Sequence, residues 1–240
     1  MKKIILFTLA LTIAVSGVQA QKQNNRKHTV TNRVSSSVDG TIDLGTESLQ
    51  ALDIIQLPAS YDGLHTPLAE VLKERCTTRN LLEEELPLEL ISSLLWSTYG
   101  FNRPDEHKRV APSAVNVQEY DIYLFTHEGV YLYNAEKNAL LLVVKGDHRG
   151  ELSQQKHFAA APISIVLVAN YDRMEVFKNL DDRDFYAAVD AGYISQNIYL
   201  FCASAHLGTV ACGAIDRDTI HKLLNIKNGR AMLAHPVGRK

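Results

Sequence analysis

The chain has 240 residues and a formal net charge of −2, with 46% hydrophobic, 22% charged and 8% aromatic residues. This ordinary globular mixture excludes a wholly disordered or collagen-like protein. The near-neutral charge lacks the basic character of a nucleic-acid-binding surface, and three cysteines are too few for a disulfide-built scaffold. The length suits one domain with an appendage.

The first twenty residues have the layout of a secretory signal peptide. Two lysines precede an uncharged apolar run at residues 4–15, and the small side chains of Val18 and Ala20 stand at −3 and −1 of a cleavage site. The alternative is a membrane anchor, but the run has about a dozen residues, whereas a spanning helix needs about 20. No cysteine follows the site and no twin arginine precedes the run. We therefore predict removal of residues 1–20 and Sec-type export to the periplasm.

The rest of the chain divides into a polar arm and a folded domain. Residues 21–50 are mostly polar and predict a flexible tether or arm, whereas residues 51–240 carry the apolar patterns of a domain. Three cysteines, Cys76, Cys202 and Cys212, cannot all pair within one chain. We expect buried small side chains rather than a Cys202–Cys212 disulfide. No metal site is expected, because none of them stands in a Cys-x-x-Cys or Cys/His pattern.

Two helices are predicted in the first half of the domain. The segment TPLAEVLKERCT has Thr66 as an N-cap and Pro67 at the first helical position. Three aliphatic side chains fall on one face of this helix, which we expect to face the core: Leu68, Val71 and Leu72. Residues 88–99 repeat apolar side chains at helical spacing, with Pro87 before them and Gly100 as the stop.

The middle of the domain predicts strands. Residues 120–126 and 130–134 alternate and contain aromatic side chains, and the intervening turn makes them a hairpin. Residues 139–144 predict a third strand. The apolar run at residues 163–169 is typical of a central strand that is buried on both faces.

The last third predicts a long helix at residues 184–207, rich in alanine, which permits close helix packing. A short helix at residues 217–224 and a strand at residues 230–237 follow. Helices flanking a modest sheet define an α+β fold.

Two polar segments are candidates for ligand binding. Arg75, Thr77 and Arg79 combine two rigid guanidinium groups with a hydroxyl, a set suited to phosphate oxygens. The alternative is a solvated basic turn at a helix C-terminus. In the segment APSAVNVQ at residues 111–118, small residues surround a proline, and polar side chains could meet the edge of a planar heterocycle. Ser113 there is also a plausible helix N-cap.

Two further segments are weaker candidates. Gln196 and Asn197 stand inside an apolar helix, where we expect a helix-packing network rather than ligand contact. The loop at residues 207–213 is built of small residues whose amides could approach a ligand. The acidic run at residues 181–184 is interpreted as a solvated helix start, and His206 and His221 as structural.

Several catalytic designs are missing from the sequence. It contains neither a Gly-x-Ser-x-Gly elbow, nor a Gly-x-Gly-x-x-Gly fingerprint, nor a His-Glu-x-x-His pair. No side chain is identified as a catalytic acid or base, although Tyr99, Arg103 and His107 lie near the pocket-forming segments.

Taken in order, these segments resemble the FMN-dependent nitroreductase family, in the branch of the SagB-type, azoline-forming dehydrogenases. The resemblance covers residues 55–238. It rests on LPAS, RCTTR, LLWSTYGFNRP, APSAVNVQE, GVYLYN, GDHR, AAPISIVLVA, GYISQNIYLF and HPVG. It implies a central, mostly antiparallel sheet flanked by helices, in an interlocked homodimer with FMN at the interface.

The resemblance also implies roles for individual residues. Arg75, Thr77 and Arg79 would hold the FMN phosphate and ribityl chain, with Thr77 in place of the serine that the family carries. A stretch from the other subunit would line the flavin: Pro112, Ser113, Ala114 and Asn116. Gln155 would reach the ribityl chain or the ring edge. Backbone amides near the reactive ring nitrogen would come from Ala211, Cys212 and Gly213.

The C-terminus departs from the family pattern. Many members carry a basic pair well beyond Pro-Val-Gly, whereas this chain ends at Arg239-Lys240. Arg239 is the candidate to replace that pair at the phosphate.

The implied activity is an exported FMN-dependent oxidoreductase. Electrons from NAD(P)H or another donor would pass through the flavin to a small acceptor. Two alternatives stay open. One is a dehydrogenase of a peptide-like substrate, and the other is a flavin- or ligand-binding protein without turnover.

Overall fold

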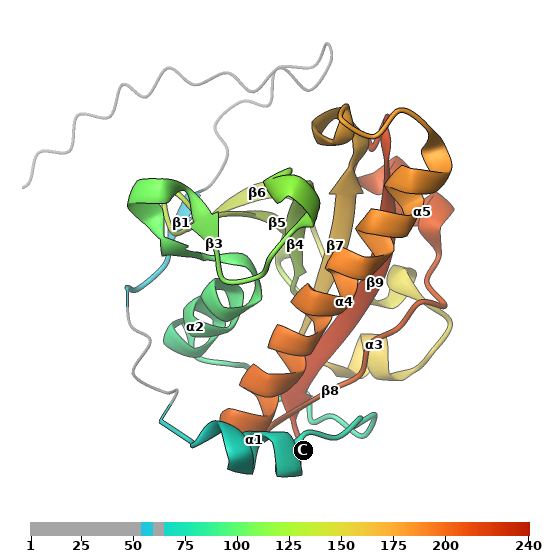
Figure 1. Cartoon of the computed structure of the whole chain (residues 1–240). Coiled ribbons are helices and arrows are strands. Elements are labelled where there is room, and N and C mark those ends of the chain that lie inside the picture. The colour runs from blue at the N-terminus through green and yellow to red at the C-terminus, as the bar shows by residue number, and fades with distance from the viewer. Residues whose placement is uncertain (1–53, 60–64) are drawn as a thin grey trace, which may run out of the picture. The chain divides into compact units, whose positions relative to one another are not determined.

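The structure, a computed structural model, describes residues 54–59 and 65–240. The predicted signal peptide and the predicted arm both lie outside the described residues, which Figure 1 draws in colour. Within this described part of the chain, no helix is long and apolar enough to cross a membrane.

A seven-stranded sheet in the order β1-β6-β5-β4-β7-β9-β8 forms the centre of the domain, and every neighbouring pair is antiparallel. Its strands are β1 (Ile54–Gln56), β4 (Tyr120–Phe125), β5 (Gly129–Asn134), β6 (Ala139–Lys145), β7 (Ile163–Asn170), β8 (Leu207–Thr209) and β9 (Gly229–Arg239). A separate small ribbon pairs β2 (Phe101–Arg103) with β3 (Lys108–Arg109). The predicted hairpin, the strand after it and the buried central strand β7 are all confirmed.

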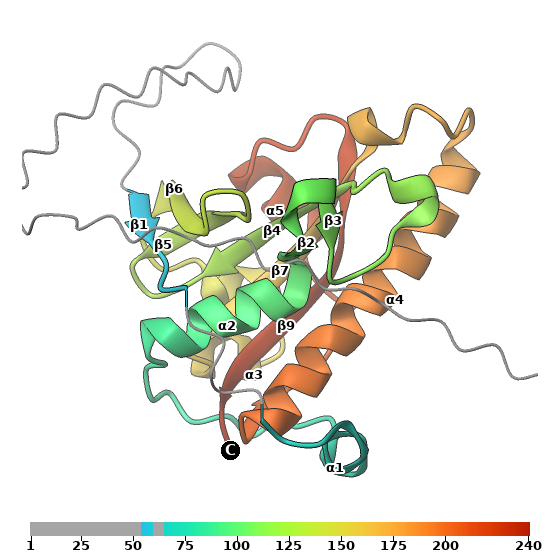
Figure 2. The same ribbon diagram turned by 60° about the vertical axis from the view of Figure 1, so that its left-hand side comes forward.

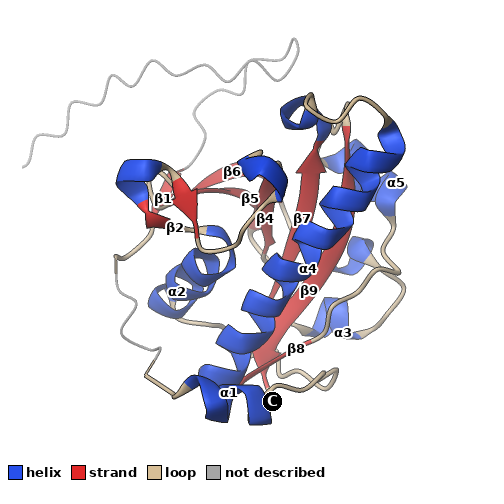
Figure 3. Ribbon diagram, in the orientation of Figure 1, coloured by secondary structure: helices blue, strands red, loops and turns tan. Residues whose placement is uncertain are grey.

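Helices cover both faces of this sheet. They are α1 (Leu68–Glu74), α2 (Leu88–Tyr99), α3 (His157–Ala160), α4 (Leu180–Ser204) and α5 (Arg217–Leu223). Figures 1 and 3 show α2 and α4 in front of the strands, with α4 running along β7 and β9. Figure 2 shows α2 crossing the same face nearer to β4. The predicted α+β class is confirmed.

Alternation along β4 divides the core into two layers. Ile122 and Leu124 join the cluster under α2 and α4, whereas Tyr123 and Phe125 join the cluster that contains Phe158 of α3. Successive side chains of a strand point to opposite faces, so one strand supplies both layers.

The long helix α4 is displaced toward the N-terminus relative to the prediction, which placed it at residues 184–207. It begins at Leu180 because the side chain of Asn179 accepts a hydrogen bond from the amide of Asp182 at 2.7 Å, as an N-cap does. It ends at Ser204, and the left-handed backbone of His206 (φ 55°) turns the chain into β8. The acidic run thus lies in the first turn of α4.

The prediction for α1 was wrong in one respect. Only Val71 of its three aliphatic side chains is buried, while Leu68 and Leu72 are 63% and 53% exposed. The helix packs against α4 along one narrow side, so its wider apolar face lies open in a single chain. Pro67 occupies the N-cap position itself, and Thr66 instead donates to the carbonyl of Ser204 at 3.4 Å.

The cysteines follow the prediction in two of three cases. Cys202 and Cys212 are buried and form no disulfide, whereas Cys76 is exposed. Cys76 follows α1 in an exposed loop.

Candidate functional site

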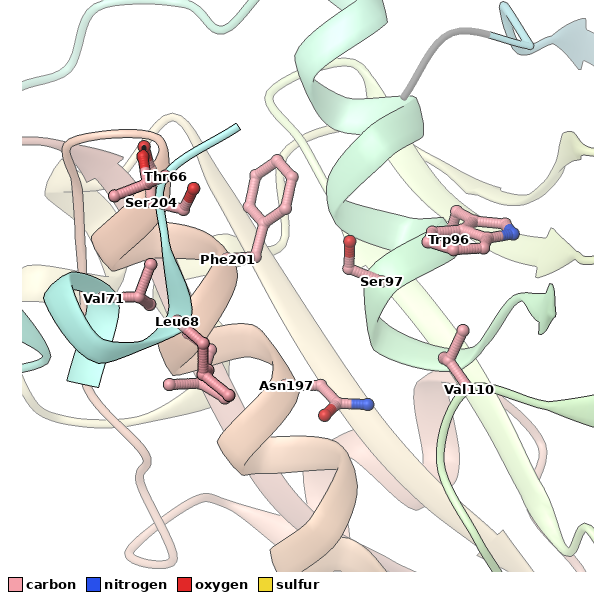
Figure 4. A pocket seen from close by; sticks show the side chains of 10 residues that line it. Thr66, Leu68, Val71, Trp96, Ser97, Val110, Asn197, Phe201 and Ser204 are labelled. Carbon is pink, nitrogen blue, oxygen red and sulfur yellow. Dashed lines mark hydrogen bonds between the residues drawn. The ribbon is translucent and has the colours of Figure 1, made fainter. Parts of the chain in front are cut away.

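A hollow of about 280 Å³ opens between α1, α2 and α4. Figure 4 shows its wall, which is largely apolar: Thr66, Leu68, Val71, Trp96, Ser97, Val110, Asn197, Leu200, Phe201 and Ser204. The packing network expected for Gln196 and Asn197 is not found among the described residues. Gln196 is exposed, and the amide of Asn197 lies at the hollow without a hydrogen bond in the described part of the chain. Asn197 can therefore offer donors and an acceptor to a ligand.

Tyr199 of α4 is the hub of a polar cluster beside this hollow. Its hydroxyl accepts from the amide of Ala211 at 2.9 Å and lies 3.1 Å from Oγ1 of Thr77. The guanidinium of Arg75 stands over its ring, 5.3 Å from the centroid. The structure thus brings together Arg75 and Thr77, which are neighbours in the sequence, with Ala211, which is far from them along the chain.

Close packing on β8 holds the Arg75–Arg79 segment in this place. The amide of Thr78 donates to the carbonyl of Thr209 at 2.9 Å. A Cβ on Gly208 would lie 2.6 Å from Leu81 and 2.9 Å from Thr78, so only glycine lets the segment approach so closely.

The arginines of the site differ in their partners. Neither Arg75 nor Arg79 forms an ion pair with any described residue. Arg239 donates from Nε to Glu84 at 2.9 Å. Arg75 and Arg79 therefore keep their charge available for an anion, whereas the charge of Arg239 already has a carboxylate beside it.

Gln155 and Cys212 meet on the other side of the loop after β8. Sγ of Cys212 lies 4.0 Å from Oε1 of Gln155 and 3.5 Å from Nε2 of His157. Burial lowers the pKa of His157, and the charge of Arg79 lowers it further. Burial raises the pKa of the Cys212 thiol, and Arg79 opposes that rise. The imidazole of His157 and the thiol of Cys212 are therefore both neutral near pH 7.

The three amides predicted to face a ligand are not equivalent. The amide of Cys212 donates to the carbonyl of Ala234 at 2.9 Å, so it belongs to the sheet. Among the described residues, the amide of Ala211 donates only to the hydroxyl of Tyr199, a side chain that can rotate. Gly213 is exposed, and its carbonyl accepts from Arg217 at 3.0 Å.

The segment from Pro112 to Asn116 lies elsewhere. The amide of Ala114 donates to Oδ2 of Asp190 on α4 at 2.8 Å. Nine residues of helix, about 13 Å along the axis, separate Asp190 from Tyr199. Within one chain, this segment is therefore apart from the Arg75–Tyr199 cluster.

Local contacts hold this segment in an unusual backbone. Ser113 accepts from the amide of Gln118 at 3.0 Å, and the Gln118 side chain donates to Oδ1 of Asn116 at 3.3 Å. Val115, Asn116 and Gln118 have φ angles of 44°, 59° and 51°. A β-branched residue in this left-handed region is strained, so the surrounding contacts must fix it.

Sequence reasoning did not single out Tyr199 or His157. Each acts through contacts to residues distant in the chain. Tyr199 lies in the segment GYISQNIYLF, of which only Gln196 and Asn197 were considered as polar candidates. Of the two histidines interpreted as structural, His221 accepts from the amide of Ala231 at 3.2 Å, while His206 lies exposed. No group of three or more potential metal-binding side chains converges within the described ranges.

The sequence profile of the nitroreductase family matches residues 72–239. The chain belongs to the nitroreductase family. It is 34% identical over 197 residues to the protein named "Putative nitroreductase MJ1384" from Methanocaldococcus jannaschii, covering 78% of this chain and 96% of that protein.

Solved structures agree with this family assignment. The crystal structure of a protein named "putative nitroreductase" from Ralstonia eutropha has a TM-score of 0.72 and 31% identity to this chain. The match covers 78% of this chain and 89% of that chain. A chain of the Escherichia coli microcin synthetase McbBCD complex has a TM-score of 0.59 at 15% identity, covering 89% and 78% of the two chains. At that identity the second likeness concerns the fold alone. The nitroreductase-like fold is thus confirmed.

Proposed function

We propose that this nitroreductase-family protein is an exported, homodimeric, FMN-dependent oxidoreductase. One observation carries the cofactor proposal. Arg75 and Arg79, which have no acidic partner among the described residues, flank a threonine hydroxyl near the C-terminal end of α4, beside an apolar hollow. This combination fits a ligand with a phosphate at one end and a flat apolar ring at the other.

The residues of this chain fit FMN with two differences from the predicted set, at Arg239 and at the amide of Cys212, which donates within the sheet. Arg75, Thr77 and Arg79 would hold the phosphate and ribityl chain, with Gln155 beside them. Arg239 fits less well, because Glu84 already neutralises it. Rotation of the Tyr199 hydroxyl would free the amide of Ala211 to donate to the ring.

The homodimer proposal rests on exposed surfaces. Val115 is 74% exposed although it is apolar and strained. Three large side chains on one stretch of α4 are also exposed: Phe185, Val189 and Tyr193. A second copy would cover these surfaces and bring its Pro112–Asn116 segment to the Arg75–Tyr199 cluster, from which it is separated within one chain.

When bound, FMN supplies the redox chemistry, accepting electrons from a donor and passing them to an acceptor. The protein would supply binding, orientation and water exclusion. Arg75 and Arg79 provide positive charge, and Leu68, Leu200 and Phe201 provide an apolar wall.

The direct test is the absorbance spectrum of the purified protein after incubation with FMN and desalting. Flavin bands at about one FMN per chain are expected. A colourless protein would contradict the cofactor proposal and leave a non-catalytic binding role.

Arg75→Ala is expected to weaken FMN binding by about 1.5–3 kcal/mol, because it removes one charge-assisted contact. That is about a tenfold to hundredfold rise in Kd, measurable by quenching of flavin fluorescence. Lys73→Ala is the matched control, since Lys73 is an exposed cation two residues earlier. Equal Kd values for wild type and Arg75→Ala would remove Arg75 from the site.

Asn116→Ala is expected to leave the dimer intact while changing the flavin redox potential or occupancy. Its exposed side chain accepts one hydrogen bond from Gln118 and packs in no core cluster. Sedimentation velocity and a spectroelectrochemical titration measure the two effects. An unchanged spectrum and potential would contradict contact with the flavin.

The electron donor and the branch of the nitroreductase family to which the protein belongs are part of the same proposal. Steady-state NAD(P)H oxidation by the yellow protein would support a nitroreductase-type cycle. Bound flavin that nicotinamides do not reduce would instead favour a SagB-type dehydrogenase. Fractionation of cells that express the full chain tests export.

A further inference from the structure

Glu119, which directly follows the left-handed residue Gln118, is a fully buried acid. Neither of its carboxylate oxygens has a hydrogen-bond partner in the described part of the chain. A buried carboxylate without partners is very costly in its ionised form. Glu119 must therefore be neutralised by a cation or by a proton.

The cation whose charge acts on Glu119, Arg173, is already engaged. Arg173 donates to Oδ1 of Asp121 at 2.6 Å and to the carbonyls of Gln118 and Tyr120 at 3.3 Å. Its side chain is 41% exposed. It lowers the pKa of Glu119 only weakly compared with the opposing effect of burial. A proton is thus the neutralising group.

The second buried acid is Asp190 of α4, and its carboxyl interacts with that of Glu119 through charge and, when one of the two is protonated, a hydrogen bond. Burial first, and then the charge of Asp190, raise the pKa of Glu119 to about 7. Burial also raises the pKa of Asp190, while the hydrogen bond from the amide of Ala114 opposes that rise. Asp190 is therefore the member of the pair that carries the negative charge, and it uses that charge to hold Ala114.

The other titratable groups around the pair stay neutral. The hydroxyl of Tyr120 donates to the carbonyl of Ala187, and the hydroxyl of Tyr99 is buried without a partner among the described residues. Burial raises the pKa of both phenols, and Glu119 raises it further. Near pH 7, Glu119 is thus the group whose charge changes.

We propose that Glu119, in its protonated form, and Asp190 are positioning residues that hold the Pro112–Asn116 segment in its strained conformation. Ionisation of Glu119 would place two negative charges side by side in the core. Relief of that repulsion would move Asp190 away from the amide of Ala114 and release the segment. Because this segment is proposed to line FMN of the partner, the inference rests on the proposed function.

The test compares wild type with Glu119→Gln, which has nearly the same shape but no charge. Nuclear magnetic resonance of the flavin-free protein follows the amide shift of Ala114 from pH 6 to pH 9. In wild type this shift is expected to titrate with a midpoint near 7, and in Glu119→Gln it is expected to stay constant. Asp190→Asn is a second variant in which the titration is also lost.

The Kd for FMN is measured over the same pH range. In wild type it is expected to rise about fivefold from pH 7 to pH 8 and about tenfold more from pH 8 to pH 9, and in Glu119→Gln it is expected to be flat. An Ala114 shift that is flat in wild type, or that titrates equally in both proteins, overturns the inference.

Failure of the proposed function is distinguishable from failure of this inference. A wild type that binds no FMN at any pH overturns the proposed function and the role at the flavin, while the Ala114 titration still decides whether the acid pair anchors the segment.

The melting temperature of the flavin-free protein is a third measurement. The pKa of Glu119 is raised on folding from 4.5 to about 7, so the folded state holds a proton that the unfolded state loses. Stability is therefore expected to fall as the pH rises from about 4.5 to about 7. Glu119→Gln is expected to lack this part of the decline, and the same decline in both proteins counts against the inference.

Discussion

Phe158→Ala is expected to lower the free energy of unfolding by about 3–5 kcal/mol, the largest stability effect that we anticipate for a single substitution. Phe158 lies on the short helix α3 with a fully buried ring, in the core layer that also contains Phe125, Leu152 and Val166. Truncation leaves a cavity that so short a helix cannot close. Thermal denaturation should show a fall of roughly 6–20 °C for a domain of this size.

The same substitution should weaken FMN binding, because Phe158 supports the segment that carries Gln155 and His157. Lys156→Ala is the control in the same segment, since Lys156 is exposed and its loss should change stability by less than about 0.5 kcal/mol. A loss of stability below about 1 kcal/mol for Phe158→Ala would mean that α3 does not pack into this core layer.

The strands were predicted well because the burial pattern of each strand can be recognised within its own short stretch of sequence. The side chains of residues 120–126 alternate in character, which fits a strand, β4, that packs one face against each core layer. The unbroken apolar run of β7 fits a strand that has a neighbouring strand on both sides. The helix α2 was also predicted with its observed limits, since Pro87 and Gly100 mark its two ends.

The faces of helices were harder to predict. The apolar pattern of α1 predicts that one side of the helix is buried, but it does not identify the part of the protein that covers this side. The described chain covers only Val71, and Leu68 and Leu72 remain open. For α4, Asn179 was not recognised as the cap, although Asn is a strong N-cap residue.

The site was predicted in part, for a similar reason. Arg75, Thr77 and Arg79 stand together in the sequence and have a recognisable chemistry. Tyr199 becomes part of the site only because the fold brings its hydroxyl to Thr77 and Ala211. Glu119 and Asp190 likewise form a pair only through the packing of β4 against α4, so no local pattern reveals them.

Arg149→Met is expected to lower the free energy of unfolding by about 2–3 kcal/mol and to loosen the segment between β6 and β7. The Arg149 side chain is only 8% exposed, and it binds Asp147 through two nitrogens at 2.7 and 2.9 Å. It also donates to the carbonyl of Ala161 at 2.7 Å. Methionine fills the space but leaves that carbonyl without a donor. The loss falls short of the 3–5 kcal/mol typical of a fully buried pair, because Asp147 is 44% exposed and can be solvated.

A double-mutant cycle with Asp147→Asn separates the ion pair from the carbonyl contact. Asp147→Asn alone should cost less than Arg149→Met, because the guanidinium keeps its bond to Ala161. In the double variant the two losses should sum to more than the measured loss, with a coupling of about 1 kcal/mol from urea denaturation. Strictly additive losses would mean that Arg149 acts through the carbonyls of Ala161 and Pro162 and not through the ion pair. In either case Arg149 ties the start of β7 to the segment that carries Gln155, so FMN retention should fall in Arg149→Met more than in Asp147→Asn.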